Sequence, residues 1–143
     1  MLVKQLSVFL ENKVGRLKEV TQILKENNVN IRTLTVSDTT DFGILRIIVD
    51  DCDKAERALK DQGYTFNKTD VLAVEIKDEP GGLNSVLEII DRSGLNIEYL
   101  YAFVHSRQDM AVNIFRFDKL DEAIKVLTDN NIKVIEGKEL YQL

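Results

Sequence analysis

Residues 78–84, Asp-Glu-Pro-Gly-Gly-Leu-Asn, separate two segments with different hydrophobic periodicities. Residues 71–76 before them predict a strand, and apolar residues recur at helical spacing after them, at Leu83, Val86, Leu87 and Ile90. Pro80 suits a first helical position, and Gly81 and Gly82 lack a Cβ, so another molecule can approach their backbone closely. The stretch therefore predicts a strand-to-helix turn whose first amides, without internal partners, attract an anion such as a carboxylate. The alternative is a tight turn that binds nothing.

The turn occurs twice, because the sequence repeats itself. With an offset of 66 residues, one set of positions matches another: Gly15, Leu17, Val20, Ile23, Asn30, Ile31 and Leu34 meet Gly81, Leu83, Val86, Ile89, Asn96, Ile97 and Leu100. With an offset of 68, a later set matches: Asp50, Asp53, Ala55, Leu59 and Asp61 meet Asp118, Asp121, Ala123, Leu127 and Asp129. The change of offset places about two extra residues in the second hairpin loop. Such self-similarity indicates a duplicated structural unit.

Each copy predicts the order β-α-β-β-α-β. In the first copy the expected strands are 3–10, 29–37, 43–49 and 64–68. One expected helix follows the turn at 12–15 and ends at Asn27-Asn28, and the other spans 53–62 and ends at Gly63. This order is that of a ferredoxin-like fold, with two helices on one face of a four-stranded antiparallel sheet. We therefore expect an α+β protein with two such modules in tandem, residues 1–68 and residues 69–143.

Composition excludes several classes of protein. The chain has 143 residues, 44% hydrophobic and 30% charged, with a net charge of −5. Nucleic-acid binders usually show a basic stripe, and none is present. The first residues are too polar for a secretory signal, and no apolar run is long enough for a membrane span. We expect a cytoplasmic protein without a cofactor or metal site.

The second strand of each module carries two further signals. In the ferredoxin-like order this strand lies at a sheet edge, and residues 99–104 are uncharged and apolar. Such an edge aggregates unless it is paired, so we expect pairing with the other module or a second subunit, and a homodimer or larger assembly. Ile31 and Leu34, like Ile97 and Leu100, are three residues apart. Either a β-bulge places each pair on one face, or the members face opposite sides.

The repeated motifs resemble those of the ACT domain, a small ligand-binding module of regulators of amino-acid metabolism. They are Asp78-x-Pro80-Gly81-x-Leu83 with Asn96-Ile97, and Asn12-x-Val14-Gly15-x-Leu17 with Asn30-Ile31, where the proline is missing. The first half also resembles the regulatory small subunit of acetolactate synthase. The resemblance implies a regulatory protein that binds a free amino acid between modules. Alternatively it implies an interaction subunit of a separate amino-acid biosynthetic enzyme.

An amino acid offers a carboxylate and an ammonium, and the repeated residues could meet both. Amides near Gly15–Leu17 and Gly81–Asn84 could receive the carboxylate. Oxygens of Asn12 or Asp78, and of Asn30 or Asn96, could accept from the ammonium. The second turn is ranked ahead, because Gly82 clears space where Arg16 crowds the first turn, although Arg16 adds a cation. The alternative roles are turn or capping residues for Asn12 and Asp78 and strand-entry residues for Asn30 and Asn96.

Catalysis is not expected. His105, the one histidine of the sequence, is predicted to lie on the surface at a hairpin, and Cys52 stands between two aspartates that should raise its pKa. Asp50, Asp51 and Asp53 are predicted to cap a helix rather than to bind a metal. The aromatic residues of the second module's edge strand favour a sheet interface over a stacking platform for bases: Tyr99, Tyr101 and Phe103.

Overall fold

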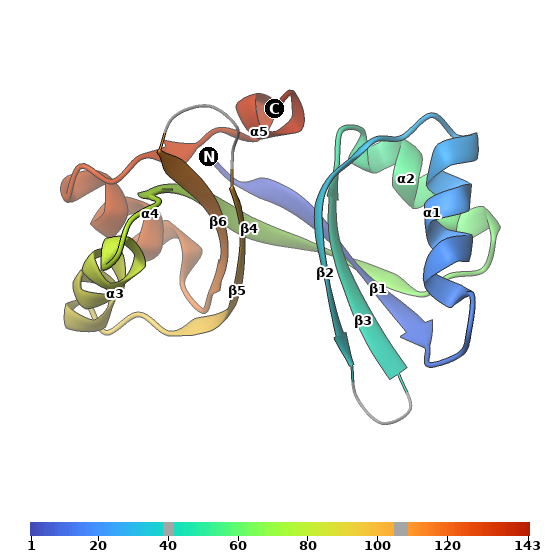
Figure 1. The fold of residues 1–143 in the computed structure, drawn as a ribbon, viewed down its shortest axis with the longest axis horizontal. Coiled ribbons are helices and arrows are strands. Elements are labelled where there is room, and N and C mark those ends of the chain that lie inside the picture. Colours follow the sequence, from blue (N-terminus) through green and yellow to red (C-terminus); the bar gives the residue numbers. More distant parts are fainter. Residues whose placement is uncertain (39–41, 105–108) are drawn as a thin grey trace. The chain divides into compact units, whose positions relative to one another are not determined.

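The computed structural model describes residues 1–38, 42–104 and 109–143, which form two compact units. One unit consists of Lys4–Thr69 with Tyr141–Leu143, here called the first unit, and the other of Asp70–Leu140 with Met1–Val3, here called the second unit. Figure 1 shows two helices against one face of the strands in each unit. Each unit is described by itself below.

The first unit has the predicted order of elements. They are β1 (Val3–Glu11), α1 (Arg16–Glu26), β2 (Ile31–Asp38), β3 (Phe42–Val49), α2 (Cys52–Asp61) and the start of β4 (Phe66–Lys77). The strands follow the order β2-β3-β1-β4, in which β2 and β1 are antiparallel to β3. The Phe9 amide donates to the Thr65 carbonyl at 3.0 Å, which joins β1 to the chain entering β4.

The second unit repeats this arrangement. It contains the rest of β4, α3 (Gly82–Arg92), β5 (Ile97–Val104), β6 (Met110–Phe117), α4 (Leu120–Asp129), β7 (Val134–Ile135) and most of α5 (Gly137–Tyr141). The strand order is β5-β6-β4-β7, and all these pairs are antiparallel. The Glu75 amide donates to the Lys133 carbonyl at 3.0 Å, the counterpart of the bond between Phe9 and Thr65. The predicted fold class is thus confirmed.

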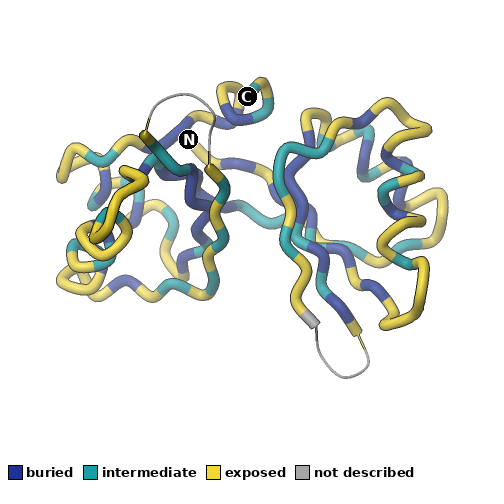
Figure 2. Tube along the Cα trace, viewed as in Figure 1, coloured by how far each residue is buried: buried dark blue, intermediate teal, exposed yellow. Residues whose placement is uncertain are grey.

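Each unit has its own core between its helices and its sheet (Figure 2). In the first unit, alternate residues of β1 and β3 pack under Val20 and Leu24 of α1 and Leu59 of α2. In the second unit, Phe115 and Phe117 stack with ring centroids 5.4 Å apart under the corresponding helices. Burial of these apolar faces stabilises the units.

Residues with special backbone geometry end the helices as the sequence predicts. Asn28 follows α1 with φ 55° and Asn131 follows α4 with φ 59°, both in the left-handed region. The Asp51 side chain caps α2 by accepting from the Lys54 amide at 3.0 Å. Asp50 is not a cap, which corrects the prediction, because its carboxylate accepts from the Asn30 amide at 2.9 Å.

Both second strands contain the β-bulge, which settles the alternative left open by the sequence. The register shifts between Ile31 and Thr33 in β2 and between Ile97 and Tyr99 in β5. The bulge places Leu34 opposite Ile47 and Leu100 opposite Phe115, so both leucines lie on the helix-covered face. Among the described strands, β2 and β5 are terminal in the strand order, as predicted.

Two elements differ from the sequence-based expectation. The strands predicted at 64–68 and 71–76 are one continuous strand, β4, and α5 was not predicted. The hairpin residues 39–41 and His105 lie outside the described residues. Among the described helices, none is long and apolar enough to span a membrane.

Candidate functional site

The two predicted turns share one backbone geometry. Gly15 and Gly81 precede α1 and α3 with φ 89° and 82°, a left-handed conformation that glycine adopts without strain. The turns are exposed, including Val14 and Pro80. Pro80 is not the first helical residue, which corrects the prediction, because it precedes the N-cap Gly81 and α3 begins at Gly82. Within the described part of the chain, no hydrogen-bond acceptor contacts four amides that open the helices: those of Leu17, Lys18, Leu83 and Asn84. Both turns therefore present amides at the positive end of a helix dipole.

Gly82 has a structural reason to be glycine. A Cβ at this residue would collide with the backbone carbonyl of Lys77 in its own turn. In the first turn Arg16 occupies the equivalent position and its amide lies 3.4 Å from the Lys13 carbonyl, whereas the Gly82 amide lies 3.0 Å from that of Glu79. The tighter second turn therefore needs a residue without a side chain, whether or not a ligand binds. Gly82 does not clear space for a ligand, which corrects the prediction, because the Lys77 carbonyl occupies the position of the missing Cβ.

The side chains of Asn12 and Asp78 project from the turns into solvent. Neither caps a helix, because the capping residues are Gly15 and Gly81 and no side chain bonds to either helix start. In residues 1–38, 42–104 and 109–143, neither side chain has a hydrogen-bond or ion-pair partner. The Asp78 backbone amide is held by the Asp109 carbonyl at 2.8 Å. The oxygens of both side chains are accordingly open to an incoming donor.

Asn30 and Asn96 lie at the other end of each sheet. The Asn30 backbone forms two hydrogen bonds with Asp50: its amide donates to the Asp50 carboxylate at 2.9 Å, and its carbonyl accepts from the Asp50 amide at 3.0 Å. Asn96 and Asp118 repeat this pair, with both bonds at 3.2 Å. β1 ends beside Phe42, the first residue of β3, whereas β2 begins beside Val49, the last residue of β3. Within one module, the turn and the second-strand asparagine are therefore not brought together.

The remaining predicted site residues divide between core and surface. Ile31 and Ile97 are half-buried and pack against the two cores. Leu17 and Leu83 are exposed at the first turns of α1 and α3. The Asn84 amide group donates to Glu88 along α3 at 3.1 Å.

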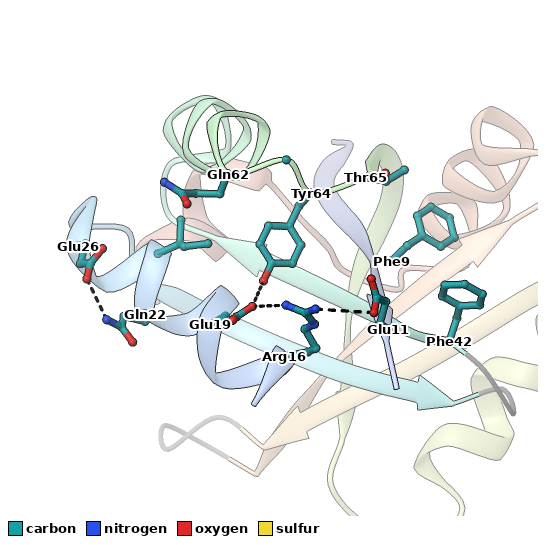
Figure 3. A pocket seen from close by; sticks show the side chains of 12 residues that line it. Phe9, Glu11, Arg16, Glu19, Gln22, Glu26, Phe42, Gln62, Tyr64 and Thr65 are labelled. Carbon is teal, nitrogen blue, oxygen red and sulfur yellow. Dashed lines mark hydrogen bonds and ion pairs between the residues drawn. The ribbon is translucent and has the colours of Figure 1, made fainter. Parts of the chain in front are cut away.

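A hollow of about 640 Å³ lies within the first unit, and sequence reasoning found only Arg16 among its residues. We call it the α1 hollow, because one wall is a stripe of α1 and the facing wall is the connection between α2 and β4 (Figure 3). It is lined by Phe9, Glu11, Arg16, Glu19, Gln22, Ile23, Glu26, Phe42, Gln62, Gly63, Tyr64 and Thr65.

A chain of polar contacts crosses the α1 hollow. The Tyr64 hydroxyl donates to Glu19 Oε2 at 2.7 Å, and Arg16 donates to the same oxygen at 2.9 Å. Arg16 also lies 3.7 Å from Glu11 Oε2, which is 2.9 Å from Lys13 Nζ. These contacts join the turn before α1 to the connection before β4.

The same contacts shift the pKa values of the groups involved. The Tyr64 hydroxyl and then the Arg16 guanidinium lower the pKa of Glu19. Burial, followed by the neighbouring Glu19, raises the pKa of Tyr64. Lys13 and then Arg16 lower the pKa of Glu11. The carboxylates are thus held in their charged form.

A comparison of the repeats provides the signal that could have revealed this network. The equivalents of Glu11, Arg16, Glu19 and Tyr64 in the second half are Lys77, Gly82, Ser85 and Ile132. Residues that differ in this way between repeats cannot be needed for the shared fold. Such differences mark the places where one copy has acquired its own chemistry.

Cys52 is not an activated nucleophile. Burial raises the pKa of its thiol to about 11, with Glu56 as the next contributor, and Sγ lies 3.7 Å from Glu56 Oε1. The direction agrees with the prediction, but the flanking aspartates are not the main cause. A thiol with so high a pKa is almost entirely protonated near neutral pH.

Comparison with solved structures shows the architecture in other proteins. A Bacteroides thetaiotaomicron protein of known crystal structure has 42% sequence identity and a TM-score of 0.95, with 100% of this chain and 98% of that chain covered. The ligand-free regulatory subunit of aspartate kinase from Thermus thermophilus has 16% identity and a TM-score of 0.65, with coverage of 88% and 90%. The regulatory subunit of aspartate kinase from Thermus flavus has 15% identity, a TM-score of 0.63 and coverage of 90% of each chain.

No protein with a curated description matches the sequence. The family comparison, in contrast, covers residues 1–143. The family is the ACT domain pair, which agrees with the two β-α-β-β-α-β modules and with the resemblance of the repeated motifs. The chain belongs to the ACT domain pair family.

Proposed function

We propose that this chain is a non-catalytic regulatory protein of the cytoplasm that binds a free amino acid at its repeated turns. The observation that carries the proposal is the pair of glycine-capped turns with unpartnered amides, in a chain that belongs throughout to the ACT domain pair family. A regulatory module needs a selective site rather than reactive groups. The raised pKa of the Cys52 thiol supports a role without covalent catalysis.

The turn chemistry fits the two charged groups of an amino acid. The ligand carboxylate lies on the amides of Leu17 and Lys18, or of Leu83 and Asn84, at the positive ends of the helices. The ammonium donates to the oxygens of Asn12 or Asp78. The second turn is ranked ahead because the full negative charge of Asp78 attracts an ammonium more strongly than the neutral Asn12 does.

We further propose that a second copy of the chain completes each site, which makes the protein a homodimer. Asn30 and Asn96 open the terminal strands β2 and β5, at the end of each sheet away from that module's own turn. A ligand on a turn can therefore contact such an asparagine only if another module supplies it. This arrangement would also cover the apolar edge strand 99–104.

A thermal-shift screen of the twenty amino acids tests the binding function. A ligand present at one hundred times its Kd adds about 2.7 kcal/mol to the free energy of unfolding, which is readily seen as a higher melting temperature. At least one amino acid should raise the melting temperature. A screen in which none does so contradicts the proposal.

A second candidate function is that of an interaction subunit for a separate enzyme of amino-acid metabolism. It is favoured by apolar residues that remain exposed on the terminal strands, with Leu34 38% and Val36 45% exposed in β2 and Val104 69% exposed in β5. Affinity purification from the native cell should then recover one such enzyme at a fixed ratio, and the added chain should change that enzyme's feedback inhibition. If the purified enzyme responds identically with and without the chain, this candidate is wrong.

A further inference from the structure

The α1 hollow carries an excess of negative charge among its lining residues. Of its lining residues, Glu11, Glu19 and Glu26 contribute carboxylates and Arg16 contributes a guanidinium. Arg16 already contacts Glu19 at 2.9 Å and Glu11 at 3.7 Å. A carboxylate that entered the hollow would have to displace one of these partners, so the lining disfavours anions.

Glu26 is the lining carboxylate with no cationic partner in the described part of the chain. Its Oε1 accepts from the Gln22 amide group at 3.0 Å, whereas Glu11 and Glu19 both form ion pairs with Arg16. Glu26 therefore offers an ammonium a charge that is not yet compensated. Hydrogen bonds between such charged groups are stronger than those between neutral groups.

The shape of the α1 hollow suits an elongated aliphatic molecule. Glu19 and Glu26 are seven residues apart on one stripe of α1, which separates them by about 10 Å along the helix axis. Ile23 lies on the same stripe by its spacing and lines the hollow, and Tyr64 lines it from the opposite wall (Figure 3), so the path between the carboxylates has apolar sides. Phe9 and Phe42 extend the aromatic surface at the Glu11 end.

The second unit does not reproduce this chemistry. In the repeat alignment, Glu19, Glu26 and Tyr64 correspond to Ser85, Arg92 and Ile132. A cation thus replaces the carboxylate of Glu26, and a small hydroxyl replaces that of Glu19. The hollow is a feature of the first unit and does not belong to the duplicated turn sites.

We propose that the α1 hollow is a separate binding site for an aliphatic amine without a carboxylate of its own, such as a linear diamine. One ammonium is held at Glu26 and the other at Glu19 Oε1, the oxygen that accepts from neither Arg16 nor Tyr64, and the aliphatic chain packs along Ile23 and Tyr64. Such a ligand lacks the carboxylate of an amino acid, which is the group that the lining of the hollow disfavours. The site is separate from the second turn, whereas it shares Arg16 with the border of the first turn.

Calorimetric titration with three related probes tests this proposal. Cadaverine is lysine without its carboxylate, and pentylamine is cadaverine with one ammonium fewer. Cadaverine should bind about three- to fivefold more tightly than pentylamine, which is the effect of one exposed ion pair, and an equal concentration of lysine should not displace it. Displacement of cadaverine by an equal concentration of lysine, equal or tighter binding of pentylamine, or no binding of cadaverine at millimolar concentration overturns the proposal.

A matched pair of variants distinguishes the hollow from general attraction to an acidic chain. Glu26→Gln removes the free carboxylate of the hollow, whereas Glu88→Gln removes an equivalent helix carboxylate that also accepts from an amide four residues earlier, at 3.1 Å. Glu26→Gln should weaken cadaverine binding about threefold and Glu88→Gln should leave it unchanged. Equal losses in both variants contradict the assignment. The amino-acid screen of the turns is a separate measurement, so either proposal can fail alone.

Discussion

Single residues determine how the two turns differ. Gly82 packs against the Lys77 carbonyl of its own turn, whereas Arg16 at the equivalent position carries a long side chain into the α1 hollow. The two copies of the turn thus differ: the second turn, with Gly82, is the tight form, and the first turn, with Arg16, is the more open form. The tight form places its glycine under a steric constraint that is independent of any ligand.

Gly82→Ala should destabilise the folded protein. The added Cβ forces the turn away from the Lys77 carbonyl, and such overpacking typically costs about 1–3 kcal/mol. Urea denaturation should show this loss in the free energy of unfolding. Asn84→Ala, two residues later on the exposed side of α3, is the control and should change it by no more than about 0.5 kcal/mol. A Gly82→Ala protein as stable as the parent would refute the steric argument.

Asp78→Ala and Asn96→Ala should weaken amino-acid binding without destabilising the free protein. Each change removes an oxygen that we place on the ligand ammonium, and about tenfold weaker binding corresponds to the lower end of a charged hydrogen bond. Both side chains are exposed, so the melting temperature without ligand should stay close to that of the parent. Calorimetric titration measures the affinity. If both variants bind like the parent, the site assignment is wrong.

At the scale of elements, a charged network ties α1 to the connection that enters β4. Glu19 accepts from both Tyr64 and Arg16, and Arg16 continues the contacts to Glu11 at the end of β1. These residues come from three elements that meet where the hollow opens. Protonation of Glu19 would remove the acceptor at the centre of this network.

Tyr64→Phe should make stability less sensitive to acid. The folded protein has a lowered Glu19 pKa, so this group stabilises the fold above its unfolded pKa of about 4.3, and the contribution is lost as the pH falls through the folded pKa. Because the Tyr64 hydroxyl is the largest cause of the shift, its removal leaves less stability to lose. Melting temperatures between about pH 7 and pH 3 should therefore fall less in the variant than in the parent.

Two outcomes check this interpretation of the acid dependence. Glu11 also has a lowered pKa, but Lys13 and Arg16 cause it, so its contribution remains in both proteins. In a double-mutant cycle, Tyr64→Phe should no longer change the acid sensitivity once Glu19→Gln has removed the carboxylate. An identical loss of melting temperature in the parent and in the Tyr64→Phe variant would show that this hydrogen bond does not affect acid stability.

The elements could largely be predicted from the sequence, because their signals are local. Hydrophobic periodicity located the helices, and glycine and asparagine marked their ends, as at Asn28 and Gly81. The continuity of β4 and the hydrogen bond from the Asn30 amide to the Asp50 carboxylate depend on segments far apart in the sequence, and neither has a local signal. The α1 hollow was missed for the same reason, since Glu19 and Tyr64 meet only after folding.

The whole molecule is a duplication whose copies have diverged at the surface and kept their cores. Corresponding residues pack in both cores, and the bulges in β2 and β5 fall at equivalent positions. The shared features include the turns, which is why we place the regulatory ligand there. The features unique to one copy include the α1 hollow, which is why we assign it a different ligand.

We expect the protein to be a homodimer in solution. Light scattering coupled to size exclusion should give twice the chain mass of 16.3 kDa at micromolar concentration. Leu100→Lys places a charge on the terminal strand β5, where this side chain is 36% exposed, and should shift the population toward monomer. A parent protein that is monomeric under these conditions would contradict the dimer and the completion of the turn sites by a second copy.

The most direct test of the central claim is an NMR titration of the isotope-labelled protein with each of the twenty amino acids. The claim is that a free amino acid binds with its carboxylate on the helix amides of the turns. With at least one amino acid, the amide resonances of Leu17 and Lys18, of Leu83 and Asn84, or of both pairs should move saturably. If no amino acid moves them, or if all changes are confined to residues of the α1 hollow, the turns are not the amino-acid site.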